Sequence, residues 1–191
     1  MNSSTTKKTG MVSLIGKTNV GKSTLLNQLV EQKVSITSRK PQTTRQRLLG
    51  IKTEGSNQII YVDTPGFHQG HKRALNKFMN KTALSSIEGV DIILFVVDAL
   101  NFSQTDEHLL SQVSTKDNQV MLVINKIDKV AKKEKLIPFV EEVTKLFPFS
   151  EVIPISALKR KNIDILEKEI TKRLPVGDHL YPEDQIADSS E

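Results

Sequence analysis

The chain has 191 residues, of which 37% are hydrophobic and 26% are charged. This composition is typical of a globular protein with one substantial core, and it excludes general disorder. Cysteine is absent, which excludes disulfides and thiolate metal sites and favours a reducing compartment. The longest apolar run, residues 92–97, is far too short to span a membrane, and the N-terminus lacks the apolar core of a signal peptide. We therefore expect a soluble cytoplasmic protein.

The formal charge of +5 raises the question of nucleic-acid binding. The lysines are scattered, however, and aromatic residues make up only 5% of the chain, so no basic run alternates with stacking residues. The densest basic cluster, residues 129–135, is interpreted as a solvated face. A weak preference for polyanions is the most that the charge of this region predicts.

Strands and helices are predicted to alternate along most of the chain. Periodicity predicts strands at 11–15, 48–53, 58–62, 91–98, 120–124 and 151–155, and helices at 22–32, 72–87, 105–113, 133–146 and 162–174. The second and third strands are close enough to form a hairpin. The alternation predicts an α/β domain over residues 11–174, with a mostly parallel sheet covered by helices on both faces. Residues 1–10 are expected to be flexible and residues 175–191 to form a linker.

The first motif is Gly16-Lys-Thr-Asn-Val-Gly-Lys-Ser23, which fits G-x-x-x-x-G-K-[ST] between a predicted strand and a predicted helix. A pyrophosphate needs a row of backbone N–H groups at a helix N-terminus, and the glycines let the backbone approach it. In such a loop Lys22 reaches the β- and γ-phosphates, and the Ser23 hydroxyl lies on Mg²⁺. The motif predicts a phosphate-binding loop.

The second motif, Asp63-Thr64-Pro65-Gly66, follows an apolar strand. A carboxylate at the carboxyl end of a strand beside a phosphate loop can hold a magnesium-bound water. The polar segment 33–47, which precedes the predicted hairpin of strands 48–53 and 58–62, is predicted to be a long mobile loop. Mobile loops near a phosphate site are candidates for switching.

Two further loops follow buried strands and have the sequences Asn125-Lys126-Ile127-Asp128 and Ser156-Ala157-Leu158. The Asp128 carboxylate can accept hydrogen bonds from the N1–H and the exocyclic amine of guanine, whereas adenine offers no such pair of donors. We expect Lys126 to lie along the purine face and Asn125 to tie this loop to the phosphate loop. The amide of Ala157 is expected to donate to the guanine O6. Together these loops predict a guanine-nucleotide site.

The ordered motifs GKTNVGKS, DTPG, NKID and SAL resemble those of TRAFAC-class GTPases. The segments QTTRQR, DTPGFH and LYPEDQIAD are similar to those of the Era family, in the TrmE-Era-Der group of that class. The resemblance covers the chain from about residue 10 to its end. It implies a Ras-like P-loop fold with six strands, one of them antiparallel, together with binding of GTP and GDP, slow hydrolysis of GTP, and Mg²⁺.

The resemblance also implies roles for particular residues. Phosphate binding is implied for Gly16, Lys17, Thr18, Asn19, Val20, Gly21, Lys22, Ser23, Thr24, Asp63, Thr64, Pro65, Gly66 and Phe67. Guanine binding is implied for Asn125, Lys126, Ile127, Asp128, Ser156, Ala157 and Leu158. Mg²⁺ binding is implied for Ser23, Thr44 and, through a water, Asp63. The implied catalytic residues are Lys22, Thr44, Asp63 and Gly66, the last through its backbone N–H on the γ-phosphate.

Two residues depart from the pattern of related enzymes. Phe67 stands where Ras-like enzymes use a glutamine to orient the attacking water, and a phenyl ring cannot do this. Several relatives in the wider class recruit K⁺ through an asparagine of the phosphate loop, which here is Asn19. We therefore expect catalysis to rest on Lys22, Mg²⁺, backbone donors and K⁺. Thr18 stands where Era proteins commonly have proline, and its effect on the rate is left open.

Family members act in assembly of the small ribosomal subunit, binding 16S rRNA through a C-terminal KH domain, and some associate peripherally with the inner face of the cell membrane. No GXXG loop of a KH domain occurs in this sequence, so rRNA binding is expected to belong to an absent domain. Two alternatives to a hydrolysing GTP switch stay open. A P-loop phosphotransferase needs an acceptor site and a lid of arginines, and neither is visible. A nucleotide-dependent interaction module with negligible hydrolysis is compatible with Phe67.

Overall fold

The computed structural model describes residues 6–30, 47–63, 89–113 and 118–182. Six strands form one sheet in the order β2-β3-β1-β4-β5-β6. They are β1 Lys8–Ile15, β2 Arg47–Glu54, β3 Asn57–Asp63, β4 Ile92–Asp98, β5 Gln119–Asn125 and β6 Glu151–Pro154. Among these six described strands, only β2 and β3 pair in antiparallel fashion, as the predicted hairpin, and the other strand pairs are parallel. The predicted six-stranded sheet with one antiparallel strand is confirmed.

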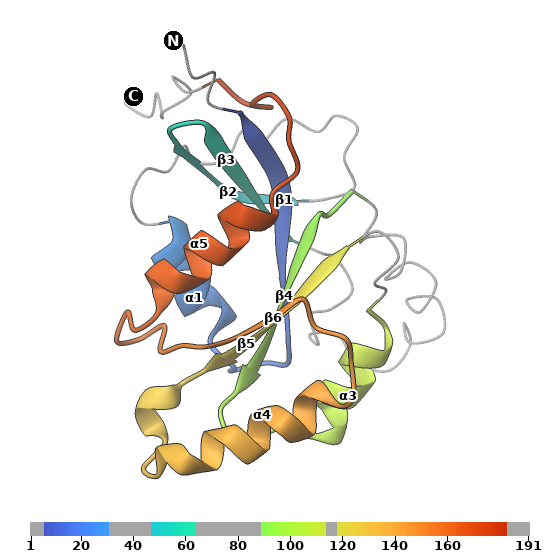
Figure 1. The fold of residues 1–191 in the computed structure, drawn as a ribbon, viewed down its shortest axis with the longest axis vertical. Coiled ribbons are helices and arrows are strands. Elements are labelled where there is room, and N and C mark those ends of the chain that lie inside the picture. Colours follow the sequence, from blue (N-terminus) through green and yellow to red (C-terminus); the bar gives the residue numbers. More distant parts are fainter. Residues whose placement is uncertain (1–5, 31–46, 64–88, 114–117, 183–191) are drawn as a thin grey trace.

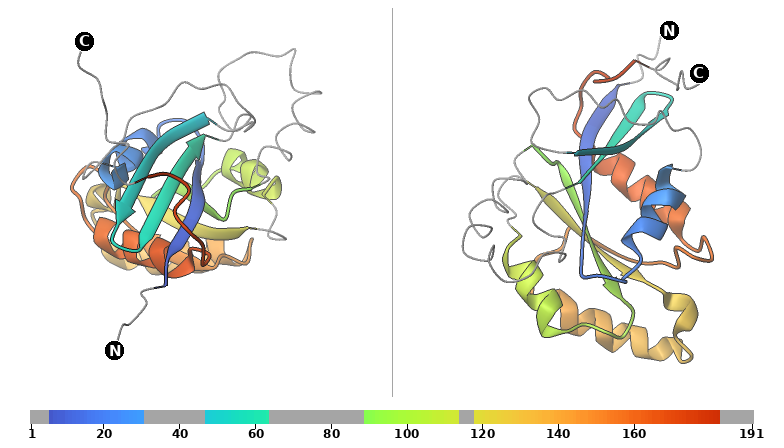
Figure 2. Two further views of the ribbon diagram at one scale, coloured as in Figure 1. Left: turned by 90° about the horizontal axis from the view of Figure 1, so that it is seen from above. Right: turned by 180° about the vertical axis from the view of Figure 1, so that it is seen from behind.

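Helices cover both faces of the sheet (Figures 1 and 2). They are α1 Lys22–Val30, α3 Gln104–Ser111, α4 Leu136–Thr144 and α5 Ile163–Arg173, with 3-10 turns at Ile127–Lys129 and Lys133–Lys135. Apolar residues of α1 and α5 join one core cluster, and those of α3 and α4 join the other. The predicted helix 72–87 and most of the predicted loop 33–47 lie outside the described residues.

The central strand β4 explains why both faces must be covered. Ile92, Leu94 and Val96 are buried in the core cluster on the α1 and α5 side. The alternate side chains Ile93, Phe95 and Val97 are buried in the other. Because side chains of a strand alternate between faces, a continuously apolar run needs helices on both sides. The uninterrupted sequence IILFVV therefore places β4 at the centre of the sheet.

Strand β1 begins at Lys8, three residues before the predicted start. Its first residues pair with β3 on one side, where Lys8 is opposite Asn57. On the other side, which β4 does not reach, the backbone of Thr9 donates to Pro175 O over 3.1 Å and Gly177 donates to Lys7 O over 3.1 Å. The expectation that residues 1–10 fray is therefore wrong for Lys8, Thr9 and Gly10, because a distant segment completes their hydrogen bonding.

The segment 175–182, predicted as part of a linker, is fastened to the sheet. The side chain of Gln58 on β3 is fully buried and accepts from the amides of Leu180 and Tyr181 over 2.9 and 3.0 Å. Its Nε2 donates to Tyr181 O over 2.8 Å and to Thr53 Oγ1 over 3.0 Å. Figure 1 shows this segment running beside the start of β1. The described part of the predicted linker is thus an ordered part of the domain.

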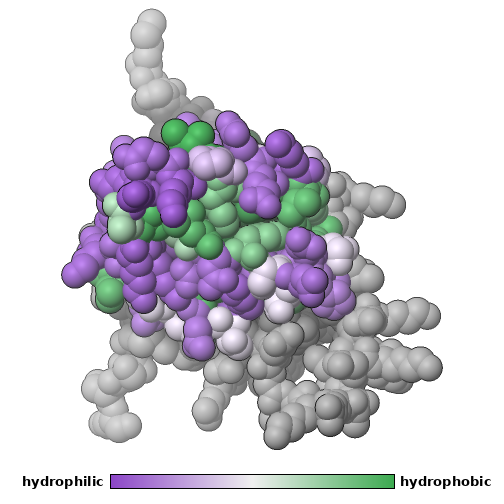
Figure 3. Space-filling model, turned by 90° about the horizontal axis from the view of Figure 1, so that it is seen from below, coloured by the Kyte–Doolittle hydropathy of each residue, from purple (hydrophilic) through white to green (hydrophobic). Residues whose placement is uncertain are grey.

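The predicted helix 133–146 is divided into a 3-10 turn and α4. Val143 of α4 is buried, whereas Ile137 is 68% exposed. Viewed from below Figure 1, the side on which α4 lies, the surface has an apolar band framed by hydrophilic side chains (Figure 3). Among the described residues, no helix has the length and hydrophobicity that a membrane crossing requires.

Candidate nucleotide-binding site

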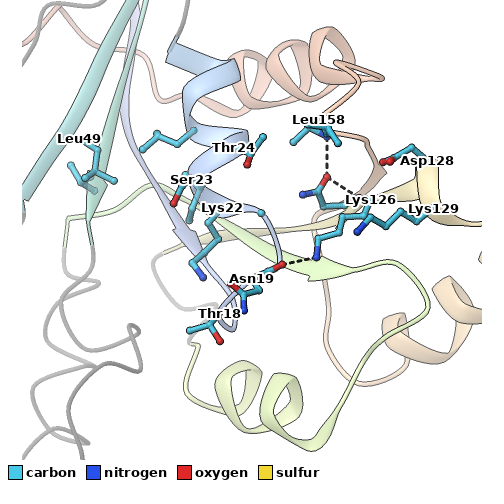
Figure 4. Close-up of a pocket in the computed structure, with 16 residues that line it drawn as sticks. Thr18, Asn19, Lys22, Ser23, Thr24, Leu49, Lys126, Asp128, Lys129 and Leu158 are labelled. Atoms are coloured by element: carbon cyan, nitrogen blue, oxygen red, sulfur yellow. Dashed lines mark hydrogen bonds between the residues drawn. The ribbon is translucent and has the colours of Figure 1, made fainter.

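Loops that follow β1, β5 and β6 surround one crevice at the carboxyl edge of the sheet (Figure 4). Its volume is about 670 Å³. Parallel sheets bind ligands at this edge because the loops that leave neighbouring strands converge there. Within the described residues, three lysines and one aspartate line the crevice, namely Lys22, Lys126, Lys129 and Asp128. The excess of positive charge suits an anionic ligand.

The loop between β1 and α1 depends on its glycines. Gly16 has φ +155°, and a Cβ there would lie 2.2 Å from the carbonyl oxygen of Val96. Gly21 has φ +97°, and a Cβ there would lie 2.3 Å from Nδ2 of Asn125. Asn19 has φ 64°, in the left-handed region that asparagine tolerates. The loop can therefore pass close to β4 and β5 before α1 begins, as the phosphate-loop motif requires.

Lys22 is the first residue of α1, and its side chain is turned back along the loop. Its ammonium donates to Gly16 O over 2.6 Å and to Lys17 O over 2.7 Å. An ammonium has three donors, so one remains for a ligand in the crevice. Burial lowers the pKa of Lys22 from its ordinary value, because removing the charged form from water is unfavourable. An anion bound beside it would offset that cost.

Asn125, the last residue of β5, joins three loops. Its Nδ2 donates to Val20 O over 2.8 Å, which fixes the phosphate loop. Its Oδ1 accepts from the amides of Lys126 over 2.8 Å and Ala157 over 3.0 Å. The predicted tie between this loop and the phosphate loop is present. The Ala157 amide, expected to donate to a guanine O6, donates to Asn125 in this structure.

Lys126 lies across the phosphate loop. The backbone of Lys126 has φ 65°. Its ammonium donates to Asn19 O and forms an ion pair with Asp98 Oδ2 over 2.7 Å. Figure 4 shows its side chain reaching from the loop after β5 towards Asn19. Its side chain thus lies beside the crevice, and its contact with a purine face stays a prediction.

Asp128 lies at the end of the crevice remote from Lys22 (Figure 4). Its Oδ1 accepts from the Ser156 hydroxyl over 2.6 Å, and Ser156 is fully buried. This hydrogen bond, with smaller contributions from its own backbone amide, Lys129 and Lys159, lowers the pKa of Asp128 from its ordinary value, although desolvation opposes the change. The exposed carboxylate is therefore ionised at neutral pH and held in one orientation.

The structure brings most of the predicted site residues to the crevice. Those that line it are Thr18, Asn19, Gly21, Lys22, Ser23, Thr24, Asn125, Lys126, Asp128, Ala157 and Leu158. Ile127 and Ser156 are buried behind this lining. Lys17 points instead towards α3, where its ammonium lies 2.8 Å from Asp106 Oδ2. Val20 is buried in the core cluster on the α1 and α5 side, and Gly16 does not line the crevice. Two predicted phosphate-binding side chains, those of Lys17 and Val20, thus lie elsewhere.

Several lining residues were not singled out in the sequence. Lys129 was assigned to a solvated basic cluster, but it directly follows the NKID motif and faces the crevice. Leu49, at the edge of the crevice, comes from β2. The position of Lys129 beside a recognised motif was a usable signal. An apolar residue such as Leu49 carries no pattern that separates a ligand contact from a core contact.

Two predicted metal or catalytic residues, Thr44 and Gly66, lie outside the described residues, as do the predicted phosphate-binding residues Thr64, Pro65 and Phe67. Ser23 is exposed in the crevice at the start of α1. Asp63 is the last residue of β3, the neighbour of β1 that leads into the phosphate loop. A hydroxyl and a carboxylate are the oxygen donors that Mg²⁺ prefers, so the chemistry of these two residues fits the ion.

The sheet order, the glycine-dependent loop and the carboxylate held by Ser156 together define the class of P-loop nucleotide-binding domains. The model of the 50S ribosome-binding GTPase family matches residues 11–126, more than half of the chain, and the chain belongs to this family.

Within the family, the relatives include proteins named GTPase Era. The one from Marinobacter nauticus is 52% identical over 182 residues, covering 95% of this chain and 60% of the relative. A crystal structure of Era in complex with MgGDPNP and nucleotides 1506–1542 of 16S ribosomal RNA has a TM-score of 0.76 at 43% identity, covering 95% of this chain and 62% of that one.

A structure of Aquifex aeolicus Era bound to GDP·AlF₄⁻ has a TM-score of 0.75 at 43% identity, with the same coverage of both chains. The resemblance to Era that the motifs indicate is thus confirmed. The chain spans about 60% of the length of the relatives that it matches.

Proposed function

We propose that this domain binds GTP and GDP with Mg²⁺ and hydrolyses GTP slowly, acting as a molecular switch. The observation that carries the proposal is the pairing of two features at opposite ends of one crevice. Lys22 lies at the phosphate end, and the Asp128 carboxylate held by Ser156 lies at the other. A triphosphate and its base thus have separate recognition groups.

The base end favours guanine for a chemical reason. The Asp128 carboxylate is acceptor-only when ionised, and its lowered pKa keeps it so at neutral pH. Guanine presents two adjacent donors to such a group, whereas adenine places an acceptor at the corresponding ring nitrogen. Discrimination is strong when the wrong ligand leaves a polar group unpaired.

The phosphate end supports a magnesium-dependent reaction. Ser23 and Asp63 supply oxygen donors, and we assign Thr44 as a further ligand and Gly66 as a backbone donor to the γ-phosphate. Mg²⁺ neutralises charge on the β- and γ-phosphate oxygens when it is bound. Lys22 can give its third donor to a phosphate oxygen while Gly16 O and Lys17 O hold it in the loop. The solved Era complex contains MgGDPNP, which supports a magnesium-bound nucleotide at such a site.

Hydrolysis here has no glutamine next to Gly66, because Phe67 takes that place. We assign K⁺, near Asn19, as an additional source of positive charge. Asn19 lines the crevice and is exposed, and its own carbonyl is already engaged by Lys126. A side-chain oxygen would therefore be the atom that Asn19 offers to an ion.

In the whole protein, we propose that this domain works in assembly of the small ribosomal subunit. Era, at 43% identity, has been solved with a 16S ribosomal RNA fragment. That fragment belongs to the small subunit, although the family is named for binding to the 50S ribosome. A KH domain beyond the residues matched here would make the RNA contact, in the cytoplasm. Peripheral attachment to the inner face of the membrane stays a prediction.

Nucleotide competition tests base selection. The protein should retain GTP and GDP at least about 100-fold more tightly than ATP. In the Asp128→Asn variant the amide exchanges an acceptor for a donor, so the preference should move from guanine to xanthine nucleotides. Equal retention of GTP and ATP would exclude the proposed function, and undiminished GTP affinity in Asp128→Asn would exclude this role for Asp128.

Phosphate release from GTP separates an enzyme from a module with negligible hydrolysis, the alternative with which Phe67 is compatible. We expect slow release over hours that is absent in Lys22→Ala and faster in potassium than in sodium buffer. The Asn19→Ala variant should lose the difference between the two ions while keeping GDP binding. Equal rates in both buffers would exclude K⁺ from the mechanism. If the original chain released no more phosphate than Lys22→Ala, the function would be that of a nucleotide-dependent interaction module.

A further inference from the structure

The side chain of Lys17 lies apart from the rest of the phosphate loop. Its ammonium donates to Asp106 Oδ2 over 2.8 Å, to Asn101 O over 3.1 Å and to Ser103 Oγ over 3.3 Å. All three acceptors belong to the start of α3 or the turn before it. A residue of the phosphate-loop motif is therefore bound to a helix that does not line the crevice.

The carboxylate that receives Lys17 is completely buried. Asp106 has 0% exposure, and its Oδ2 also accepts from the amide and the hydroxyl of Ser103, the N-cap of α3. Within the ranges that the structure describes, its Oδ1 has no hydrogen-bond partner. Among the described residues, Lys17 is the cation paired with this buried charge. A charge pair removed from water is held more firmly than a surface pair, because a buried carboxylate cannot replace its partner with solvent.

The backbone of the same residue contacts the phosphate lysine. Lys17 O accepts a hydrogen bond from Lys22 Nζ over 2.7 Å, and the neighbouring Gly16 O accepts another over 2.6 Å. The later part of the loop is held from outside by Asn125 on Val20 O and by Lys126 on Asn19 O. The first part is held by the Lys17 side chain on α3. Lys17 thus connects α3 to the carbonyl that positions Lys22.

We propose that Lys17 is a positioning residue for nucleotide binding, not a phosphate ligand, and that its ion pair with Asp106 fixes the half of the loop that orients Lys22. The proposal rests on the proposed function, because it concerns the same crevice. It assigns α3 a role in phosphate binding through one buried ion pair. The competing role for Lys17 is direct: its ammonium leaves Asp106 and binds a phosphate.

The two roles predict opposite effects of Asp106→Asn. This variant removes the charge that holds Lys17 but leaves the ammonium near the crevice. If Lys17 positions the loop, GDP binding should weaken about tenfold, as it should in Lys17→Met. If Lys17 binds phosphate directly, Asp106→Asn should bind GDP as tightly as the original chain or more tightly. The double variant should be no weaker than Lys17→Met, since both changes break one contact.

The experiment measures dissociation constants of the full chain for GTP, GDP and guanosine. Positioning through Lys22 predicts tenfold losses for GTP and GDP and less than twofold for guanosine, which has no phosphates. Lys17→Arg, which keeps a cation of similar reach, should restore GDP binding to within about threefold. Lys168→Met and Asp164→Asn, both exposed on α5, are the matched controls and should bind like the original chain.

The original chain is measured first. Absence of guanine-nucleotide binding there overturns the proposed function itself. Binding by the original chain with unchanged GDP affinity in Asp106→Asn overturns only the positioning role. Equal losses for guanosine and GDP also overturn it, because they indicate a general loss of structure. Thermal unfolding of each variant, measured in parallel, identifies the temperature at which all of them are folded and can be compared.

Discussion

Each end of the sheet has a buried side-chain amide that joins several segments by hydrogen bonds, but only one end has a crevice that can bind a ligand. At the carboxyl end, the buried Asn125 amide ties three loops around the crevice. At the amino end, the buried Gln58 amide ties β3 to β2 and to the segment 175–182. The difference is in the charges: Lys22 and Asp128 remain available to a ligand at the first end, whereas Gln58 uses its whole amide within the chain. A buried amide with all its hydrogen bonds made holds the surrounding segments rigidly in place. A binding site needs, in addition, charged groups that can still contact a ligand.

The largest expected effect is on the free energy of unfolding, and it compares one glycine at the carboxyl end of the sheet with one at the amino end. Gly16→Ala places a Cβ 2.2 Å from a backbone oxygen, so it should lower the free energy of unfolding by more than about 3 kcal/mol. Gly55→Ala, in the β2–β3 turn at φ +57°, meets no atom within 4 Å and should cost about 1 kcal/mol for backbone conformation alone. Urea unfolding measures both values. Equal costs would show that the contact with β4 is not what demands Gly16.

The next largest effect is expected for Asn125, at the carboxyl end of the sheet beside the crevice. Asn125→Leu removes the amide that pairs with Val20 O and the Ala157 amide, so two buried backbone groups lose their partners. We expect a loss of about 3 kcal/mol in unfolding free energy and a GDP affinity lowered at least about 100-fold. Isothermal calorimetry and urea unfolding provide the two numbers. Loss of stability with unchanged affinity would contradict the view that Asn125 frames the site.

Gln58→Leu is the counterpart at the other end. It leaves the amides of Leu180 and Tyr181 without their acceptor, and we expect a loss of about 2 kcal/mol. Hydrogen exchange at these amides should accelerate strongly while GDP affinity stays within about twofold. Gln119→Leu, at an exposed position on β5, is the control and should change neither. Slow exchange at Tyr181 in Gln58→Leu would mean that other contacts hold the segment.

The smallest effect is on protonation of Asp128. Ser156→Ala removes the hydroxyl that contributes most to lowering the pKa of this carboxyl, so its pKa should rise towards the ordinary value. Because the folded pKa lies below the unfolded one, the stabilisation is present at neutral pH and is lost as the pH falls through the folded pKa. The carboxyl carbon resonance of Asp128, followed by NMR, reports the pKa in both proteins. An identical titration in Ser156→Ala would assign the shift to another cause.

The sequence predicted elements whose signal is local. The uninterrupted apolar run IILFVV, the phosphate-loop spacing and the NKID motif each determine their own structure, and all three were found where expected. Contacts between distant residues left no such trace. Nothing in the sequence around Lys17 indicates Asp106, and nothing around Gln58 indicates Tyr181, because both pairs are brought together only by the fold.

Gln58 and Asp63 are near opposite ends of the same strand, about 17 Å apart along β3. The strand that ends beside the phosphate loop therefore begins where residues 180 and 181 are anchored. Residues 180 and 181 therefore lie on the side of the domain away from the crevice, on a strand whose other end reaches the phosphate loop. A spectroscopic probe attached near Tyr181 would thus report on the first residues of β3 without contacting a ligand in the crevice.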